Sequence, residues 1–534
     1  MAYKKILVDI PTERVSFKKA PNGARYVYYH LRYYRNDKGT PTRKEVSIGK
    51  TSTEQEGKMY PNETYFEYFE SAPNVSVQEI PNGILQAGST AFLAHLAEDL
   101  DLSQILESVF GSLTSQILSL ANYMISQGNV MMYLENFYQT HYNPYDTSLS
   151  SRHLSEIYDQ ITPEKRDEFF TLWQEHLQVD GDYVAYDVTS ISTHAKDIPM
   201  AEKGYNRDGE RLPQLNVGMF YSQTQTLPLG YVIYHGSIVD KSYFANLVQY
   251  ATHLGLERVI FVLDRGFLTK EHLQETLKDL NYILAFPSSQ KTYSDFLLEH
   301  APSIKNLDNY SFDVDVYCGQ SPIMIEDTVL TGFAYYDSSK SADGEQAIYQ
   351  AIREKKETYQ SQLDRKKRKQ TDPYYDLQVE GGALTNYTLN NQRVQEKLDL
   401  AGMFGLVTNI VDIPADEALK IYRRRDTIEK AFDSLKNDLD FGRFKTHSTQ
   451  STQGKFFIGF IALILQAEIQ RKSTHELRKK VPTIKSLILE LDKIQRVIWN
   501  DQATLFAPLT KKQKDILGHF EIDPDVFEEK IVKN

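Results

Sequence analysis

The feature that most constrains the fold is a change of hydrophobic period at about residue 183. Before this point the pattern is helical, and after it short apolar runs alternate with helical segments. Three strands are predicted in succession, then a helix, a strand, a helix and a strand: 183–189, 214–221, 229–235, 242–254, 258–264, a helix capped by Thr269, and 282–286. A meander followed by alternating helices and strands is the order of a ribonuclease-H-like mixed sheet. We therefore predict an α/β domain of this type.

The rest of the chain divides around this predicted sheet into regions of different pattern. Residues 26–35 and 43–48 alternate like strands, and the turn 36–39 joins them into a β-hairpin. Residues 89–177 have helical periodicity, whereas the region after 286 is less regular and contains a highly charged helix. The predicted organisation is a basic β-hairpin arm (1–60), a linker and helical block (61–180), the ribonuclease-H-like domain (181–286 and 400–473), a β-containing insertion subdomain (287–399) and a helical C-terminal tail (474–534).

Positive charge is concentrated at the start of the chain. The net charge of the 534 residues is −12, yet the first fifty residues hold twelve Lys and Arg against four Asp and Glu. Several of these cations are interleaved with tyrosines: Arg25, Arg32, Arg35, Arg43 and Lys44. A small basic and aromatic sheet can track a phosphate backbone, but the same pattern also suits a hairpin that only aids solubility.

Two further regions leave the same choice open. The helical block is either a DNA-binding bundle or a structural one, because no recognition helix can be singled out. The basic run Arg365–Lys369 is either a DNA contact or a solvated face. For the basic run the solvated face is the commoner case, because charge runs are usually solvated.

Composition excludes several other classes of protein. The single cysteine, Cys318, rules out an intramolecular disulfide and any multi-cysteine zinc site. The first residues lack the apolar core of a signal peptide. The longest apolar run, 456–465, is too short to span a bilayer. We therefore expect a cytoplasmic protein that does not associate with membranes.

A helix with a polar stripe beside an apolar face is predicted from Tyr422 to Lys436. The stretch contains no Pro or Gly and consists mostly of good helix formers. At about 100° per residue, Tyr422, Arg425, Glu429 and Lys436 fall on one stripe about 60° wide. The apolar face beside it consists of Ile421, Ile428, Ala431, Phe432, Leu435 and Leu439. Such a stripe suits a carboxylate that holds a metal while its neighbours hold phosphate, although surface ion pairs on an ordinary amphipathic helix give the same pattern.

Three acidic residues stand where the predicted sheet would gather them. Asp187 lies in the first strand, Asp264 ends the strand 258–264, and Glu429 lies on the helix described above. One carboxylate at the end of an apolar strand is often structural, because its burial is costly unless it is paired. Three together are better explained by divalent ions, for which hard oxygen ligands suit Mg²⁺ or Mn²⁺. Two such ions can support phosphoryl transfer between nucleic-acid strands.

A second group of polar residues comprises weaker candidates for the same site. Asp182 and Asp240 lie close in sequence to the predicted strands, and either could be mistaken for a ligand. His235 and His447 are lone histidines, which are more often structural than functional. Lys445 follows the predicted helix and is a weak candidate for a DNA contact.

With these residues in place, the sequence resembles the DDE transposases of bacterial insertion sequences, in particular the IS4 family. The family signature Tyr-x2-Arg-x3-Glu-x6-Lys is met by Tyr422, Arg425, Glu429 and Lys436. The segment Asp264–Phe267 matches the Asp-x-Gly-aromatic motif, and Tyr-Asp-Val-Thr-Ser around Asp187 matches the strand that bears the first acid. The 164 residues between Asp264 and Glu429 agree with the β-rich insertion of the family.

The resemblance implies a function and a role for each residue. Asp187, Asp264 and Glu429 are expected to bind two ions of Mg²⁺ or Mn²⁺, and Tyr422, Arg425 and Lys436 are expected to hold DNA. The enzyme would cleave insertion-sequence ends and join their 3′-hydroxyls to target DNA. It would act as a homodimer on terminal inverted repeats and associate with the nucleoid when bound. A decayed or repurposed DNA-binding protein and a nuclease without strand transfer remain the alternatives.

Overall fold

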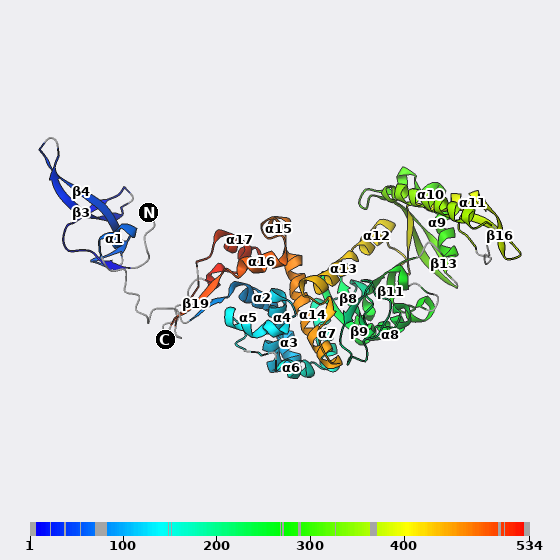
Figure 1. The fold of residues 1–534 in the computed structure, drawn as a ribbon, viewed down its shortest axis with the longest axis horizontal. Coiled ribbons are helices and arrows are strands. Elements are labelled where there is room, and N and C mark those ends of the chain that lie inside the picture. The colour runs from blue at the N-terminus through cyan, green and yellow to red at the C-terminus, as the bar shows by residue number, and fades with distance from the viewer. Residues whose placement is uncertain are drawn as a thin grey trace. The chain divides into compact units, whose positions relative to one another are not determined.

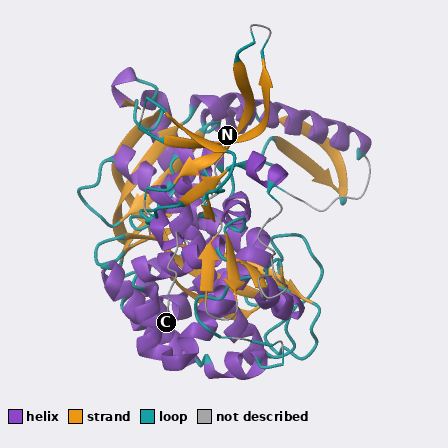
Figure 2. Ribbon diagram, turned by 90° about the vertical axis from the view of Figure 1, so that its left-hand side faces the viewer, coloured by secondary structure: helices purple, strands orange, loops and turns teal. Residues whose placement is uncertain are grey.

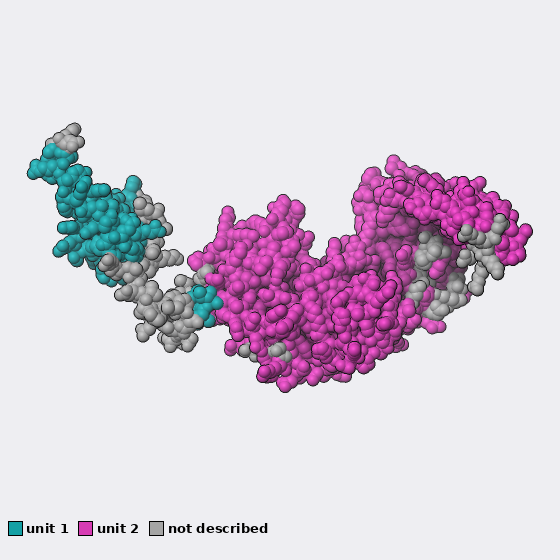
Figure 3. Space-filling view, in the orientation of Figure 1, with its two compact units in different colours: residues 1–84, 497–505, 530–534 teal, residues 85–496, 506–529 magenta. Residues whose placement is uncertain are grey.

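The structure is a computed structural model and forms two compact units, which are described separately here (Figure 3). One unit comprises residues 1–84, 497–505 and 530–534, and the other comprises residues 85–496 and 506–529. The described residues are 7–527 except 22, 37–38, 54, 70–82, 148, 151, 268, 270–271, 287–289, 326, 364–370, 500–502 and 507. The basic run 365–369, most of the predicted linker and the centre of the hairpin turn lie outside them.

The smaller unit is an antiparallel sheet in the order β1-β5-β4-β3-β2. Its strands and following helix are β1 (Val8–Asp9), β2 (Val15–Lys19), β3 (Arg25–Arg35), β4 (Pro41–Thr51), β5 (Lys58–Pro61) and α1 (Glu63–Tyr68). Val27, Ile48, Met59 and Tyr65 form its core. The predicted hairpin is present as β3 and β4, but it is the centre of a larger sheet. The prediction missed β2 and β5 because they are short and mostly polar on one face.

The centre of the larger unit is a sheet in the order β12-β13-β14-β17-β11-β10-β7-β8-β9. Its first half consists of β7 (Tyr183–Thr193), β8 (Gln214–Ser222), β9 (Leu227–His235), α8 (Asp240–His253), β10 (Ile260–Leu263) and β11 (Asn281–Ala285). Strands β7, β8 and β9 form an antiparallel meander, whereas β10 runs parallel to both β7 and β11. This is ribonuclease-H-like topology, and the predicted fold class is confirmed.

The region predicted as an insertion subdomain contributes strands to the same sheet. Strand β17 (Met403–Thr408) pairs with both β11 and β14 (Thr328–Tyr336), and β13 (Val316–Ile325) and β12 (Tyr310–Ser311) follow outward. The remaining elements are α9 (Lys291–Ile304), α10 (Ser338–Ser361), the hairpin β15 (Tyr375–Glu380) and β16 (Ala383–Leu389), and α11 (Asn391–Asp399) (Figure 1). A boundary at residue 287 therefore does not separate the sheet from the insertion, because the aromatic run 333–336 is buried against β17.

The chain combines many helices with strands (Figure 2), and one long helix packs against both the helical block and the sheet. The block consists of α2 (Gly88–Asp99), α3 (Leu102–Phe110), α4 (Thr114–Gln127), α5 (Leu134–Thr140), α6 (Leu154–Gln160) and α7 (Pro163–Leu177). Helix α14 (Thr449–Lys472) packs Phe457 on Phe110 of the block and Phe456 on Tyr231 of β9. It is the one helix among the described residues with the length and hydropathy of a membrane span, but 94% of that window is buried inside the protein. Its apolar character is therefore that of a core helix.

The C-terminal segment is only partly helical. It contains α15 (His475–Lys480), α16 (Ile484–Leu491) and α17 (Lys511–His519). Strands β19 (Gln495–Trp499) and β20 (Ala503–Phe506) lie between α16 and α17, so the prediction of a helical tail is wrong in this part. Strand β19 includes Val497, Ile498 and Trp499, which favour extended structure.

Helix α14 also buries a cation. Lys455 is 4% exposed, and its Nζ donates to the carbonyl oxygen of Asn129 at 2.8 Å. Burial lowers the pKa of Lys455 to about 8, assisted by Lys445 and opposed by Asp440. Since the pKa in the folded state lies below that of the unfolded chain, the contribution of this group to stability is complete only above the unfolded pKa and is lost as the pH falls through 8.

Replacing this lysine should therefore change the pH dependence of stability. We expect the free energy of unfolding of the wild type to rise relative to Lys455→Met by about 3 kcal/mol between pH 7 and 10.5. Urea unfolding of both proteins across this range measures the difference, and the exposed Lys430→Met serves as control. A constant difference between wild type and Lys455→Met would contradict a buried, depressed lysine.

Candidate active site

Two aspartates are brought together by the parallel pairing of β7 with β10. Asp187 is the only partly exposed residue of β7 after Tyr183, and its side chain is 21% exposed. Ala185 of β7 lies opposite Val262 of β10. Because the strands are parallel, Asp264, which directly follows β10, is level with Asp187 on the neighbouring strand. Adjacent strands lie about 4.8 Å apart, so the two carboxylates share one end of the sheet.

The segment that carries the third acid is not the continuous helix predicted for residues 422–436. Helix α12 (Ala415–Arg423) ends before Arg425, α13 (Asp426–Asp433) follows, and a π-helix spans Ser434–Asp438. At the break the N–H of Arg425 donates to the carbonyl of Tyr422, three residues back rather than four. A uniform 100° per residue therefore does not hold through the stretch. The six residues of the predicted apolar face are nevertheless all buried.

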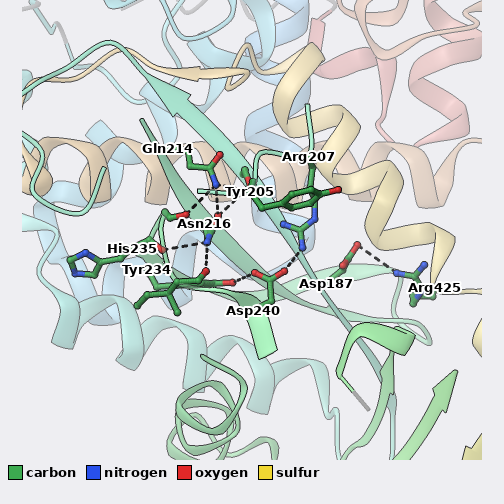
Figure 4. Close-up of polar contacts among 12 residues, drawn as sticks. Asp187, Tyr205, Arg207, Gln214, Asn216, Tyr234, His235, Asp240 and Arg425 are labelled. Carbon is green, nitrogen blue, oxygen red and sulfur yellow. Dashed lines mark hydrogen bonds and ion pairs between the residues drawn. The ribbon is translucent and has the colours of Figure 1, made fainter. Parts of the chain in front are cut away.

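The guanidinium of Arg425 lies between the acids. Its Nη1 is 3.5 Å from Oδ2 of Asp187 (Figure 4). Its Nη2 donates to Oε1 of Glu429 at 2.8 Å. One planar guanidinium thus reaches both carboxylates, which places them within about 9 Å of each other. The hydroxyl of Tyr422 donates to Oδ1 of Asp264 at 3.3 Å, which ties the second aspartate to the same segment. All three predicted acids therefore surround the turn at Arg425.

The pKa values follow from this crowding. Burial opposes the charge on Arg425, but Tyr422 and the three carboxylates Asp187, Asp264 and Glu429 raise its pKa. Burial raises the pKa of Asp187, and the Val188 N–H, Arg425 and Arg207 only partly oppose this effect. Burial, followed by the charge of Asp264, raises the pKa of Tyr422 to about 12, so Tyr422 remains a hydrogen-bond donor at neutral pH. Around Asp187 the effect of burial thus outweighs that of the nearby cations.

The donor set suits a hard divalent cation in its chemistry, since it offers only carboxylate oxygens. Among the described residues, however, no three His, Cys, Asp or Glu side chains are grouped closely enough to hold an ion directly. The side chain of Glu429 is 52% exposed and turned to Arg425. Asp187 and Asp264 lie level on neighbouring strands, and the guanidinium of Arg425 separates Glu429 from Asp187. The roles of the three acids as metal ligands remain predictions.

The last residue of the signature, Lys436, is held by the loop after β7. Its Nζ lies 2.6 Å from Oδ2 of Asp208, and its side chain is 14% exposed. Asn206 fixes this loop, because its side chain accepts from the N–H groups of Asp208 and Glu210 and donates to Ser192. The candidate residues predicted from the sequence do not include this loop of sequence Gly-Tyr-Asn-Arg-Asp-Gly. Its alternating charges were the available signal that it pairs with neighbouring elements.

Asp240, one of the weaker candidates from the sequence, belongs to a polar network with Tyr234 and Arg207 (Figure 4). Asp240 accepts from the hydroxyl of Tyr234 at 2.6 Å and pairs with Arg207. Arg207 in turn lowers the pKa of Asp187 by its charge. Asp240 therefore positions a cation that faces the site without itself joining the group around Arg425.

The other weaker candidates have partners of their own. Asp182 accepts from the Ser222 hydroxyl and from the N–H of Thr224. His235 lies 3.3 Å from Glu202, and Lys445 pairs with Asp440. His447 is exposed. None of these contacts involves Asp187, Asp264 or Glu429.

Without a bound metal, the buried charge of Asp187 is expected to lower the free energy of unfolding at neutral pH. Because the pKa of Asp187 is raised by folding, its favourable contribution is present below the unfolded pKa of about 4 and is lost as the pH rises through the folded value. We expect Asp187→Asn to increase the free energy of unfolding at pH 7 by on the order of 1 kcal/mol. The gain should vanish as the pH falls toward about 4.

Urea unfolding in EDTA measures this difference. Asp182→Asn is the matched control, and it should lose stability because Asp182 accepts two hydrogen bonds at the start of the same strand. Destabilisation by Asp187→Asn at pH 7 would contradict the uncompensated charge.

Comparison with known proteins identifies the family of the chain. Residues 180–465 match the transposase DDE domain family, over more than half of the chain. No curated protein matches the chain. Among solved structures, the synaptic complex of piggyBac transposase with hairpin DNA has 11% identity and a TM-score of 0.30, with 84% of this chain and 82% of that chain covered. The paired-end complex of Mos1 transposase with the left transposon end has 17% identity and a TM-score of 0.15, with 39% and 60% covered. By the match over residues 180–465, the chain belongs to the family of transposases with a DDE domain.

Proposed function

We propose that the protein is an active transposase of the IS4 type, which cleaves the ends of its insertion sequence and joins the 3′-hydroxyls to target DNA by two-metal phosphoryl transfer. The observation that best supports this proposal is the convergence of Asp187, Asp264 and Glu429 on the single cation Arg425. Family membership alone supports DNA transposition only in general. An acid cluster whose negative charge is only partly compensated by one guanidinium is a site that can exchange this cation for metal.

Each residue of the site has a role in this proposal. Asp187, Asp264 and Glu429 would hold Mg²⁺ or Mn²⁺, which when bound activates a water or 3′-hydroxyl and stabilises the leaving oxygen. Tyr422 keeps Asp264 oriented through its hydrogen bond. Arg425 leaves the carboxylates and forms charge-assisted hydrogen bonds to a DNA phosphate. Lys436 makes the same exchange, from Asp208 to phosphate.

The partners follow from the chemistry. We propose that the substrates are duplex DNA carrying the terminal inverted repeats and a second duplex as target. A homodimer would hold the two ends in one synaptic complex. Located in the cytoplasm, the protein would then be associated with the nucleoid while bound.

Removal of any one acid should abolish the chemistry but not DNA binding. We expect Asp187→Ala, Asp264→Ala and Glu429→Ala each to reduce cleavage and joining by at least about 10³-fold, because the ions would lose a ligand. Asp433→Ala is the control, since this exposed carboxylate on α13 faces a hollow lined by Ile469 and Ile484 instead. The assay uses duplexes containing the DNA flanking the gene, with Mg²⁺ or Mn²⁺.

The outcomes separate the alternatives. Near-normal turnover of any acid variant would refute the triad. A wild type that binds these duplexes without cutting them would be a repurposed DNA-binding protein. One that cuts but never joins would be a nuclease.

Metal binding can be measured without activity. Since the Arg425 guanidinium contacts Asp187 and Glu429, it competes with a divalent ion for them. We expect Arg425→Gln to bind Mn²⁺ roughly tenfold more tightly than the wild type, as judged by thermal shift and calorimetry. The exposed neighbouring Arg424→Gln should bind as the wild type does. Unchanged or weaker binding by Arg425→Gln would show that no such competition exists.

A further inference from the structure

The outer half of the β3–β4 hairpin projects beyond the sheet of the smaller unit (Figure 1). Strand β2 pairs with β3 only from Arg25 to Tyr29, and β5 pairs with β4 only from Gly49 to Thr51. Residues 30–35 and 41–45 therefore pair only with each other among the described strands. We call this two-stranded segment the ribbon. A two-stranded segment without a hydrophobic face is marginally stable in water. The side chains of the ribbon are therefore better explained by binding than by folding.

Cations lie on both faces of the ribbon. Arg32 stands opposite Lys44, Tyr33 opposite Arg43, Tyr34 opposite Thr42 and Arg35 opposite Pro41. Since successive side chains alternate between faces, one face carries Arg32, Lys44 and Tyr34, and the other carries Arg43, Arg35 and Tyr33. Like charges directly opposite each other destabilise a strand pair. The Arg32–Lys44 pair is therefore unfavourable until an anion approaches it.

The described part of the ribbon contains one acid, and that acid is already engaged. Glu45 lies at the base of the ribbon, pairs with Lys18 and is 3.0 Å from Nε of Arg43. Its side chain is 15% exposed. Arg32, Arg35 and Lys44 are exposed, so they present positive charge to solvent. The ribbon as a whole is a cationic element on a chain with net charge −12.

Two tyrosines project among these cations. Tyr33 is 65% exposed and Tyr34 is 47% exposed, although aromatic side chains are usually more buried. Local contacts hold both rings: the Tyr33 hydroxyl is 2.7 Å from Nδ1 of His30, and the Arg32 guanidinium lies 5.5 Å from the centre of the Tyr34 ring. The rings are therefore ordered before any partner binds, as in surfaces that bind macromolecules.

We infer that the ribbon binds duplex DNA by lying in the major groove. This groove is about 12 Å wide and admits a two-stranded β-ribbon. Phosphates line both of its walls, so an element inside it meets negative charge on both faces, whereas a flat anionic surface would need cations on one face only. The exposed tyrosines then reach the base edges or sugars. The inference rests on the proposed function and adds the element through which the smaller unit recognises the ends.

The experiment compares the salt dependence of binding for matched variants of the full chain. The ribbon variant is Arg32→Gln, Arg35→Gln and Lys44→Gln, the three exposed cations of the ribbon that carry no ion pair with Glu45. The control removes three cations of the same unit outside the ribbon: Arg14→Gln, Lys19→Gln and Lys50→Gln. Affinity is measured by fluorescence anisotropy in EDTA, with duplexes of about four helical turns that carry either the DNA flanking the gene or a scrambled sequence. Circular dichroism checks that each variant is folded.

We expect the ribbon variant to reduce the slope of log affinity against log salt by about two to three, as for the loss of three phosphate contacts, and to weaken binding at least about tenfold. The control should change the slope by less than one. Tyr33→Ala should keep the wild-type slope but reduce the preference for the flanking over the scrambled duplex. An unchanged slope in the ribbon variant, or an equal loss in the control, would overturn the inference.

Failure of the proposed function would look different. A wild type that binds through the ribbon but neither cuts nor joins DNA with Mg²⁺ would leave the inference intact and refute the activity. A ribbon variant that binds and cuts DNA as the wild type does would refute the inference about the ribbon and leave the proposed activity intact. If the ribbon binds an acidic protein instead of DNA, the ribbon variant will keep the wild-type slope of log affinity for DNA against log salt. This outcome would contradict the inference.

Discussion

The ion pairs of Arg425 with Asp187 and Glu429 are the interaction on which the site depends. The acids come from a central strand, from the end of its parallel neighbour, and from a helical segment far along the chain. Charged groups at the end of a buried sheet repel one another unless a cation stands between them. The break between α12 and α13 places that cation, and the Tyr422 hydroxyl secures the second aspartate. The geometry of the acids is therefore inseparable from this one guanidinium.

The other cations near the site are held in the same way. Lys436 is paired with Asp208, Arg207 with Asp240, and Arg443 with Glu210. Each of these three cations has a carboxylate partner within the protein. A phosphate that enters must replace an existing partner instead of meeting a bare charge. Such exchange favours ligands that offer several phosphates at once, because single ion pairs in water are worth little.

Parts of this arrangement could be predicted from the sequence because they depend on local pattern. Strands β7 to β11 have strong apolar runs and clear turns, and their order indicated the ribonuclease-H-like sheet. The apolar residues from Ile421 to Leu439 were identified as a buried face, which does not require a perfectly regular helix. That Asp187 and Asp264 lie level depends on strand register, which the sequence only suggested through the fold class.

The parts that failed depend on pairing between distant segments. Strand β14 joins the central sheet only because β17, about 70 residues later, lies beside it. The turn at Arg425 is invisible to a helical wheel, which assumes equal rotation at every residue. The ion pairs of the loop at Asp208 need the fold to bring Lys436 near, more than 200 residues downstream. Most of these failures concern which elements meet, whereas the strands β19 and β20 in the predicted helical tail are a failure in the type of element.

Helix α14 has a consequence for how the protein is made. Its aromatic residues fill the space between the helical block and β9, so the two share one continuous core. During synthesis the meander leaves the ribosome more than 200 residues before this helix does. Until then the apolar face of β9 that packs on α14 is exposed. A nascent chain truncated before residue 449 would keep this apolar surface exposed. Premature termination should thus yield aggregates, not a smaller working enzyme.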